Sequence, residues 1–232
     1  MKKTNYYRID YAINPEAIGK LSSPEDCQIN DFIDSENNSV ERLDLYQEIG
    51  IEHVNESLAM DKFKVQNNAN LTDLLSSLYF PQGLFVSQKF IDLMLNYQVL
   101  NHKIIPCSLT HKNKKQLYYI ISFITTKNII NFNKSKFVIT DETKLKPKKI
   151  EEIQLISEED LDDKINVLYL KHMNFDYKIR PTKLVLKHKV DFLKLDIDET
   201  LYVSQNLKNK LEEEQLTGIE FKETDIEFYI EE

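Results

Sequence analysis

The sequence is poor in the residues that build several common kinds of binding site. It contains no tryptophan, four glycines, six prolines and two cysteines among 232 residues. Isolated glycines do not form the glycine-rich loops that hold phosphate groups, and so few glycines and prolines leave little material for flexible linkers. Cys27 and Cys107 lack the spacing of a zinc motif, so we expect a reduced, cytoplasmic protein.

Long apolar runs are also missing, and no stretch approaches the roughly 18 consecutive apolar residues of a membrane-spanning helix. Lys2 and Lys3 are followed by polar residues, so we expect neither a secretory signal nor a membrane partner. The five histidines are scattered, and we expect no metal or other cofactor. The run Asp196-Ile197-Asp198-Glu199 lacks the glycine and distal acid of a calcium loop, and we interpret it as an acidic turn.

The clearest positive feature is a repeated pentapeptide pattern. Leu84-Phe85-Val86-Ser87-Gln88 recurs as Leu201-Tyr202-Val203-Ser204-Gln205. Each copy is followed by an amphipathic stretch, Gln88–Tyr97 or Gln205–Gln215, and then by an apolar run, 102–107 or 219–221. We therefore predict two related strand–helix–strand repeats, around 84–107 and 201–221.

The residue types of the repeat explain this prediction. Branched and aromatic side chains favour extended backbone, and a serine after them suits the N-cap of a helix. Phe90, Leu93, Met94 and Tyr97 then recur at helical spacing. After the second helix we expect Gly218 to be the left-handed residue that ends it. A chance match at a strand-to-helix junction is the alternative.

Net charge is −8 but unevenly distributed. Residues 102–150 hold eleven lysines and two acids, whereas residues 196–232 hold twelve acids and three lysines. Two solvated faces, or segments that neutralise each other, would account for this pattern. An acidic docking surface for a basic partner, such as a nuclease, would also account for it, because complementary charge speeds association.

Lys112, Lys114 and Lys115 precede Tyr118 and Tyr119, a combination that can grip single-stranded nucleic acid. A lysine-rich hairpin loop leading into a core strand explains the same residues. Because the chain is acidic overall, we expect no nucleic-acid partner.

The remaining pattern indicates an α+β fold in which mainly antiparallel strands are covered by a few helices. Twelve phenylalanines and twelve tyrosines supply ample core material. We expect an N-terminal α+β segment, 1–75, packed on a domain formed by 76–232, in one compact fold. Among single elements, the pattern predicts helices over 40–46 and 71–79, strands over 49–54, 117–125 and 167–170, and a capped acidic helical turn at Ser157.

Three segments together resemble the bacterial polymorphic-toxin immunity proteins, in particular the immunity families numbered eleven and forty-three and their relatives. They are Phe85-Val86-Ser87-Gln88-Lys89-Phe90, then Leu117-Tyr118-Tyr119-Ile120-Ile121-Ser122 with Asn131-Phe132-Asn133-Lys134-Ser135, and Leu201–Gln205 through Leu216-Thr217-Gly218-Ile219-Glu220-Phe221. The resemblance covers roughly 75–223, with a weaker echo in 6–9. Ser122 and Asn131 stand where the family often has asparagine and aspartate, so no role is carried over to them.

The resemblance implies a cytoplasmic protein that binds and neutralises a cognate toxin by covering its active site, without catalytic residues. If the acidic end of the chain is the docking face, the candidate contact residues are Glu212, Glu213, Glu214, Glu220, Glu223, Phe228 and Tyr229. An uncharacterised hydrolase or transferase with a dispersed active site is the alternative. A regulatory module that binds an unrelated host protein is a third possibility.

Overall fold

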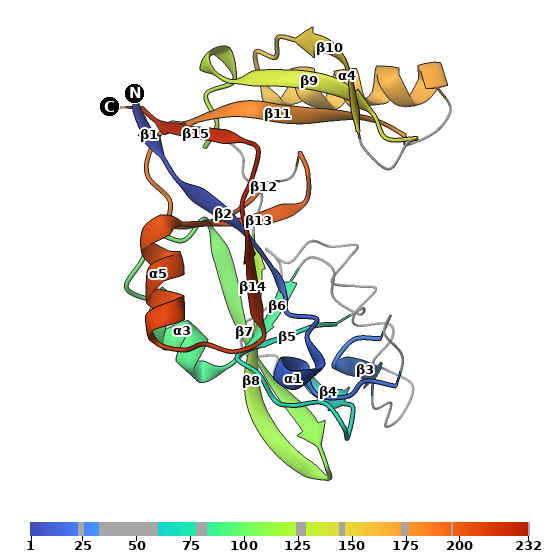
Figure 1. Ribbon diagram of the computed structural model, residues 1–232, viewed down its shortest axis with the longest axis vertical. Coiled ribbons are helices and arrows are strands. Elements are labelled where there is room, and N and C mark those ends of the chain that lie inside the picture. The colour runs from blue at the N-terminus through green and yellow to red at the C-terminus, as the bar shows by residue number, and fades with distance from the viewer. Residues whose placement is uncertain are drawn as a thin grey trace. The chain divides into compact units, whose positions relative to one another are not determined.

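The protein has an α+β fold dominated by antiparallel strands, and its chain divides into two compact units (Figure 1). The computed structural model describes residues 1–22, 26–32, 60–77, 83–123, 129–143, 147–172, 176–195 and 197–231. Unit 1 comprises Met1–Arg8, Thr125–Gln205 and Lys222–Glu232, and unit 2 comprises Ile9–Ile124 and Asn206–Phe221. The helix expected at 40–46 and the strand expected at 49–54 lie outside the described residues.

Unit 2 contains a six-stranded sheet in which most neighbours are antiparallel. Its order is β3 (Ile29–Phe32), β4 (Met60–Val65), β7 (His102–His111), β8 (Lys114–Phe123), β6 (Gly83–Val86) and β5 (Leu74–Leu75), and only β4 and β7 pair in parallel among the pairings described here. Alternate residues of β7 are buried, as expected for a strand with one face on the core. Phe63 and Phe85 meet edge to face in this core, with ring centroids 4.8 Å apart.

The β7–β8 hairpin turns at Lys112 and Asn113, whose φ angles are 49° and 62°. Positive φ at both central residues gives a turn whose twist matches the flanking strands. The lysine-rich segment at 112–115 is therefore the tip of a hairpin that leads into the core strand β8, as the sequence predicts.

Unit 1 contains a five-stranded sheet ordered β1 (Lys2–Thr4), β15 (Glu227–Ile230), β11 (Tyr177–Leu186), β9 (Lys136–Asp141) and β10 (Lys148–Ile153). The 3₁₀ turn η2 (Phe132–Lys134) precedes β9, and α4 (Glu158–His172) packs along β11. The amide of Asp160 donates to the Ser157 hydroxyl at the start of α4 (3.2 Å), which confirms the capped acidic turn.

A further sheet is ordered β12 (Phe192–Leu195), β13 (Thr200–Ser204), β2 (Tyr6–Tyr11) and β14 (Ile219–Lys222). In unit 1, Tyr6, Tyr7 and Arg8 of β2 pair antiparallel with β13. In unit 2, the amide of Ala12 donates to the carbonyl of Gly218, just before β14. The helix α1 (Pro15–Ile18) follows β2, with Asn14 as its N-cap.

Both predicted repeats form a strand, a helix and a strand. In the first, β6 leads through Ser87 into α3 (Gln88–Met94) and then β7. In the second, β13 leads through Ser204 into α5 (Gln205–Glu213) and then β14. Ser87 is the N-cap of α3, since its hydroxyl accepts from the amide of Phe90 (3.2 Å).

The first repeat carries a set of four hydrogen bonds within unit 2. Ser87 donates its amide to the carbonyl of Asp73 (2.9 Å) and its hydroxyl to the carboxylate of Asp73 (2.6 Å). Tyr118 of β8 donates to the carbonyl of Thr72 (2.9 Å), and its neighbour Tyr119 donates to the side chain of Gln88. We call this set the serine clasp of unit 2.

Unit 1 holds the same four bonds at the second repeat. Ser204 donates its amide to the carbonyl of Asp191 (2.8 Å) and its hydroxyl to the carboxylate of Asp191 (2.7 Å). Tyr6 of β2 donates to the carbonyl of Val190, and Tyr7 donates to Gln205 (2.6 Å). Each unit therefore contains one serine clasp. The two pentapeptides make equivalent hydrogen bonds, which a chance match at a strand-to-helix junction would not explain.

Several element predictions are wrong. Residues 71–77 form no helix, because Leu74 and Leu75 pair with β6 as strand β5. Val167–Leu170 belongs to α4 and not to a strand. The expected domain boundary at 75–76 falls inside unit 2, since β5 and β6 pair across it.

The end of α5 also differs from the expectation. Gln215, with φ 55°, is the left-handed residue, and the amide of Leu216 donates to the carbonyl of Leu211 (3.0 Å). Gly218 has φ 81° for another reason: a Cβ atom there would lie 2.1 Å from the carbonyl oxygen of Leu74. The glycine is thus required by close backbone packing beyond the helix end.

Candidate partner-binding groove

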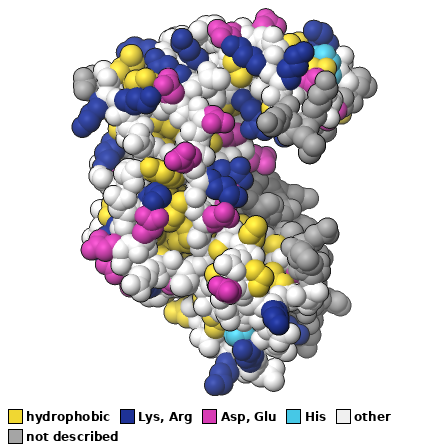
Figure 2. Space-filling model, viewed as in Figure 1, with side chains coloured by type: hydrophobic (Ala, Val, Ile, Leu, Met, Phe, Trp, Pro, Cys, Tyr) yellow, Lys and Arg dark blue, Asp and Glu magenta, His cyan; other side chains and the backbone are white. Residues whose placement is uncertain are grey.

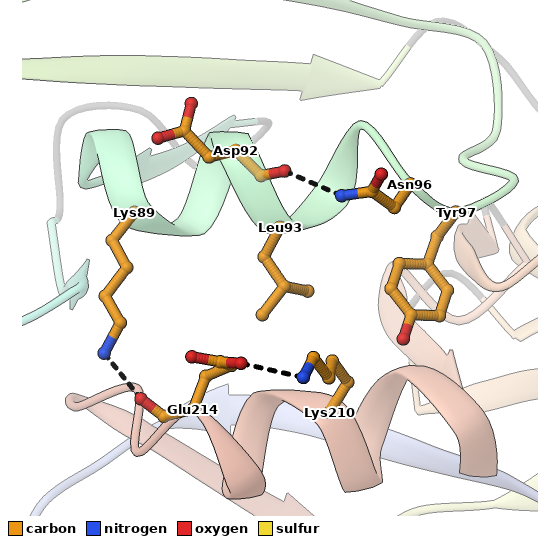
Figure 3. A pocket seen from close by; sticks show the side chains of 7 residues that line it. All are labelled: Lys89, Asp92, Leu93, Asn96, Tyr97, Lys210 and Glu214. Carbon is orange, nitrogen blue, oxygen red and sulfur yellow. Dashed lines mark hydrogen bonds and ion pairs between the residues drawn. The ribbon is translucent and has the colours of Figure 1, made fainter.

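The two helices that follow the repeated pentapeptides line a groove of about 480 Å³ in unit 2 (Figure 3). Its lining comes from α3 and the turn after it, and from the last turn of α5. These residues are Lys89, Asp92, Leu93, Asn96, Tyr97, Lys210 and Glu214. We call this surface the α3/α5 groove.

Local sequence determines which side chains reach the groove. Phe90, Ile91 and Met94 of α3, and Leu207 and Leu211 of α5, are buried in the core. Leu93 is 8% exposed and points into the space between the helices, while Tyr97 is half-buried beside it. The groove therefore has an apolar floor between two amphipathic helices.

Two basic and two acidic side chains surround this floor, so their charges balance. Lys89 donates to the backbone carbonyl of Glu214 (2.5 Å), and Lys210 pairs with the carboxylates of Glu214 (2.7 Å) and Glu213 (3.1 Å). These hydrogen bonds raise the pKa of Lys210 and lower the pKa of Glu214. Both shifts favour the charged forms of Lys210 and Glu214, so the groove is suited to recognition through charge and apolar contact.

Four of the predicted contact residues lie in unit 2. Glu212 is exposed and pairs with Lys208 (2.7 Å), one helical turn earlier. Glu213 and Glu214 share Lys210, so the acidic end of α5 is neutralised in part by its own lysines. Glu220 of β14 is half-buried.

The other three predicted residues lie in unit 1, and one of them is a correction. Phe228 is 1% exposed and contacts the rings of Tyr6 and Tyr202, with centroids 4.6 and 5.3 Å away. It is a core residue and cannot serve as a surface anchor. Tyr229 is half-buried with the Lys183 ammonium 4.9 Å from its ring centroid, and Glu223 is exposed.

The Asp198 carboxylate of the acidic turn at 197–199 is occupied by hydrogen bonds to neighbouring residues. Asp198 accepts from the hydroxyl of Tyr202 (2.6 Å) and the amide of Thr200 (3.0 Å). Burial raises the pKa of Asp198, although these bonds act in the opposite direction. Among the described residues no group of three or more histidine, cysteine, aspartate or glutamate side chains is placed to hold a metal ion.

The segment 131–135, which contributes to the family resemblance, forms the turn η2. The Asn131 side chain accepts from the amide of Lys134 (3.2 Å) and donates to Glu231 (2.8 Å). The Ser135 hydroxyl donates to the carbonyl of Asn131 (2.7 Å) and accepts from the amide of Val185 (3.0 Å). This turn connects β9 to β11 and β15 within unit 1.

Sequence reasoning missed the residue that organises the groove, Asp73. Its carboxylate accepts from Ser87, and also from the amide and hydroxyl of Thr217 after α5 (2.8 and 3.0 Å). A signal was present: Asp73-Leu74-Leu75 precedes the first pentapeptide much as Asp191-Phe192-Leu193 precedes the second. The repeat therefore begins earlier than the pentapeptide alone indicates.

Acidic and basic side chains are interspersed over the face of the described residues that is drawn in Figure 2. No helix in the described part of the chain is both long and apolar enough to cross a membrane. A scan against models of protein families gave no match for this chain, and a search of curated proteins gave none either.

Proposed function

We propose that this protein is an immunity protein that binds a cognate bacterial toxin in the cytoplasm and blocks its active site, without catalysis of its own. The resemblance of residues 75–223 to polymorphic-toxin immunity families supports the class of partner. The α3/α5 groove supports the mode of action, because it offers a surface for gripping another macromolecule.

The observation that carries the proposal is the composition of this groove. Leu93 and Tyr97 provide an apolar floor, and Lys89, Asp92, Lys210 and Glu214 provide a charged rim. Tight protein interfaces have the same organisation, in which a few desolvated anchors are surrounded by polar groups that exclude water. An apolar side chain on a toxin segment would fit between the helices while its neighbours engage the rim.

Hydrogen bonds hold both walls of the groove in place before any partner arrives. Asp73 bonds to Ser87 at the start of α3 and to Thr217 after the end of α5. Lys89 adds a direct link from α3 to the last turn of α5. A surface that is already ordered loses less conformational entropy on binding, which favours high affinity.

The acidic residues of α5 favour a basic partner, such as a nuclease toxin. Glu212 and Glu213 are exposed and pair with lysines within their own helix, at 2.7 and 3.1 Å. Exposed pairs of this kind contribute little to stability, so a basic toxin can replace the lysines at small cost. We expect association to be faster at low salt for this reason.

The experiment is expression of this chain together with the product of the neighbouring toxin-like gene. The proposal predicts restored growth of cells that express the toxin, and co-purification of the two proteins. Growth arrest that this chain does not relieve, with no complex recovered, would refute the proposed function.

Two adjacent substitutions then test the groove. Asn96 lines it, and Asn96→Arg places a long cation across its floor. Leu95 is 71% exposed and does not line the groove. Leu95→Arg is therefore the control, because it adds the same side chain at the adjacent position outside the groove. We expect the first variant alone to weaken binding by about tenfold or more, the loss typical of a blocked interface centre. Equal affinities for both variants would place the interface elsewhere.

A further inference from the structure

The two helices of the α3/α5 groove start from equivalent points of the two repeats. Ser87 precedes α3, and Ser204 precedes α5. Strand pairing is also equivalent, because the residue before each serine lies opposite the second tyrosine of its clasp, Tyr119 or Tyr7. Residues of α3 and α5 can therefore be aligned by matching these two serines.

Aligned in this way, the two helices turn equivalent faces towards the groove. Leu93 of α3 corresponds to Lys210 of α5, and both line the groove. Tyr97, after α3, corresponds to Glu214, after α5, and these two line it as well. The helices run antiparallel, since Lys89 at the start of α3 donates to the carbonyl of Glu214 at the end of α5 (Figure 3). A patch that faces its own equivalent across antiparallel helices has local two-fold symmetry, so the groove is a trough between two matched walls.

The matched walls differ in chemistry. The α3 wall contributes the apolar surface, because Leu93 is buried at its base and Tyr97 is half-buried beside it. The α5 wall is charged, because Lys210 pairs with the carboxylates of Glu214 (2.7 Å) and Glu213 (3.1 Å), whose side chains are 45 and 70% exposed. A segment that fills the trough must therefore be apolar on one side and polar on the other.

The backbone at the ends of both walls is already hydrogen-bonded. At the end of α3, the carbonyls of 91–94 accept from the amides of Leu95, Asn96 and Tyr97 and from the Asn96 side chain, at distances between 2.9 and 3.2 Å. At the end of α5, the carbonyl of Glu214 accepts from a lysine of α3. An extended segment pressed between these walls would leave its own backbone amides and carbonyls without partners, whereas a helix satisfies them internally. The trough therefore suits a helix.

We propose that the α3/α5 groove binds an amphipathic helix of the toxin, packed lengthwise between α3 and α5. Its apolar side chains contact Leu93 and Tyr97, and its basic side chains face Glu213 and Glu214. The α3 side of the lining spans residues 89–97, about 12 Å along a helix axis, which corresponds to roughly two turns of the bound helix. The contacting apolar residues of the toxin are therefore spaced three or four apart. The assignment rests on the proposed function and specifies the part of the toxin that this protein recognises.

Photo-crosslinking identifies the bound segment in the complex of the full chain with its toxin. Tyr97→benzoylphenylalanine places a photoreactive ring in the groove, and Leu95→benzoylphenylalanine places one at an exposed position that does not line it. We expect the first variant to link to a single toxin segment after irradiation, and the second variant to give at most about a tenth of that product. Mass spectrometry of the linked peptides identifies the segment.

Alanine substitution along that toxin segment then tests its conformation. Substitution at the positions that contact the groove should raise the dissociation constant by about tenfold or more, and these positions should recur every three or four residues. Proline at an outward-facing position in the centre of the segment should weaken binding by at least as much, whereas alanine at the same position should not. Circular dichroism of each free toxin variant shows whether it folds, and the alanine pattern still decides the conformation if the proline variant does not.

The outcomes separate the bound helix from the proposed function. Failure to restore growth, with no complex recovered, would refute both. A toxin that is neutralised in a complex, but that Tyr97→benzoylphenylalanine does not link, would overturn only the helix in the groove. A linked segment whose sensitive positions alternate every second residue, as in a strand, or follow no period would do the same.

Discussion

Asp73 and Thr217 are 144 residues apart in the chain, yet the carboxylate of Asp73 accepts hydrogen bonds from both the amide and the hydroxyl of Thr217, at 2.8 and 3.0 Å. The amide of Asp73 in turn donates to the Thr217 hydroxyl (3.1 Å). The same carboxylate accepts from Ser87. One side chain thus holds the hairpin β5–β6, the start of α3 and the segment after α5 together within unit 2.

Removing this carboxylate should destabilise unit 2. We expect Asp73→Ala to lower the free energy of unfolding by about 2–3 kcal/mol, because three charge-assisted hydrogen bonds lose their acceptor. Urea denaturation followed by tyrosine fluorescence measures this change. Asp92→Ala on α3 is the control: Asp92 is exposed, and we expect a change below about 0.5 kcal/mol. Equal effects of the two substitutions would contradict the role assigned to Asp73.

Asp191 of unit 1 is the equivalent of Asp73, and replacing it should destabilise the strands of unit 1 rather than those of unit 2. Asp191 is 3% exposed, accepts from Ser204 and pairs with Lys189 (3.1 Å). Asp191→Ala should reduce hydrogen-exchange protection in β12 and β13, whereas Asp73→Ala should reduce it in β5 and β6. If either substitution affected both sets of strands equally, the two serine clasps would not be independent.

The two residues with positive φ after α5 should respond in opposite directions. Gly218→Ala places a Cβ atom 2.1 Å from the Leu74 carbonyl at φ 81°, and we expect a loss of more than about 2 kcal/mol. Gln215→Gly relieves a left-handed conformation at φ 55° and should stabilise the protein by about 0.5 kcal/mol. Thermal unfolding of both variants tests the pair. A higher melting temperature for Gly218→Ala would disprove the packing argument.

Glu142 should make the stability of unit 1 depend on pH in the acidic range. Hydrogen bonds from Arg180 (2.5 Å) and Lys178 (3.3 Å) lower the pKa of Glu142, so its contribution is fully present above the unfolded value of about 4.3. The contribution disappears as pH falls through the lower pKa of the folded state. We expect Glu142→Gln to cost about 1 kcal/mol at pH 7, allowing for screening of the partly exposed cations, and nothing at the acidic end.

A pH series of urea denaturation curves for the wild type and Glu142→Gln measures this difference. Asp198 has the opposite sign, because burial raises its pKa and its ionisation opposes folding as pH rises. That effect is common to both proteins and cancels in their difference. A gap between the two curves that stays constant from pH 7 to the acidic end would rule out the ionic contribution of Glu142.

Charge reversal on α5 tests the proposed docking of a basic toxin. We expect Glu212→Lys, Glu213→Lys and Glu214→Lys combined to slow association at low salt by about tenfold or more, with a smaller effect at high salt. The substitutions also leave Lys208 and Lys210 beside new positive charges, so the melting temperature must be measured in parallel. Unchanged association of a folded variant would show that this face does not dock the toxin.

The sequence predicted what depends on local pattern. The pentapeptides located both strand–helix junctions, and Ser87 is the helix N-cap that its position predicted. The prediction failed at Leu71–Tyr79, where helical spacing of leucines occurs in a segment whose Leu74 and Leu75 pair with β6 instead. Strand pairing across a loop is a tertiary interaction, and it outweighed local periodicity.

The groove was harder to predict than the fold. Acidic residues of α5 were identified from charge alone, but their pairing with Lys208 and Lys210 follows from helical geometry. Phe228 was a candidate anchor because it lies past the last strand of the second repeat, but it is 1% exposed and contacts the rings of Tyr6 and Tyr202. Leu93 and Tyr97 were recognised only as one helical face, since nothing in the sequence shows that α5 lies opposite them.

The chain order of unit 1 has a consequence for synthesis. Strand β1 lies at the edge of its sheet beside β15, which follows it far along the chain, with Lys3 opposite Tyr229 and in contact with Glu227. A ribosome must therefore translate the chain as far as β15 before β1 can pair with its neighbour. Until then the backbone amides and carbonyls of β1 remain hydrated, and this edge of the sheet forms only once β15 has emerged.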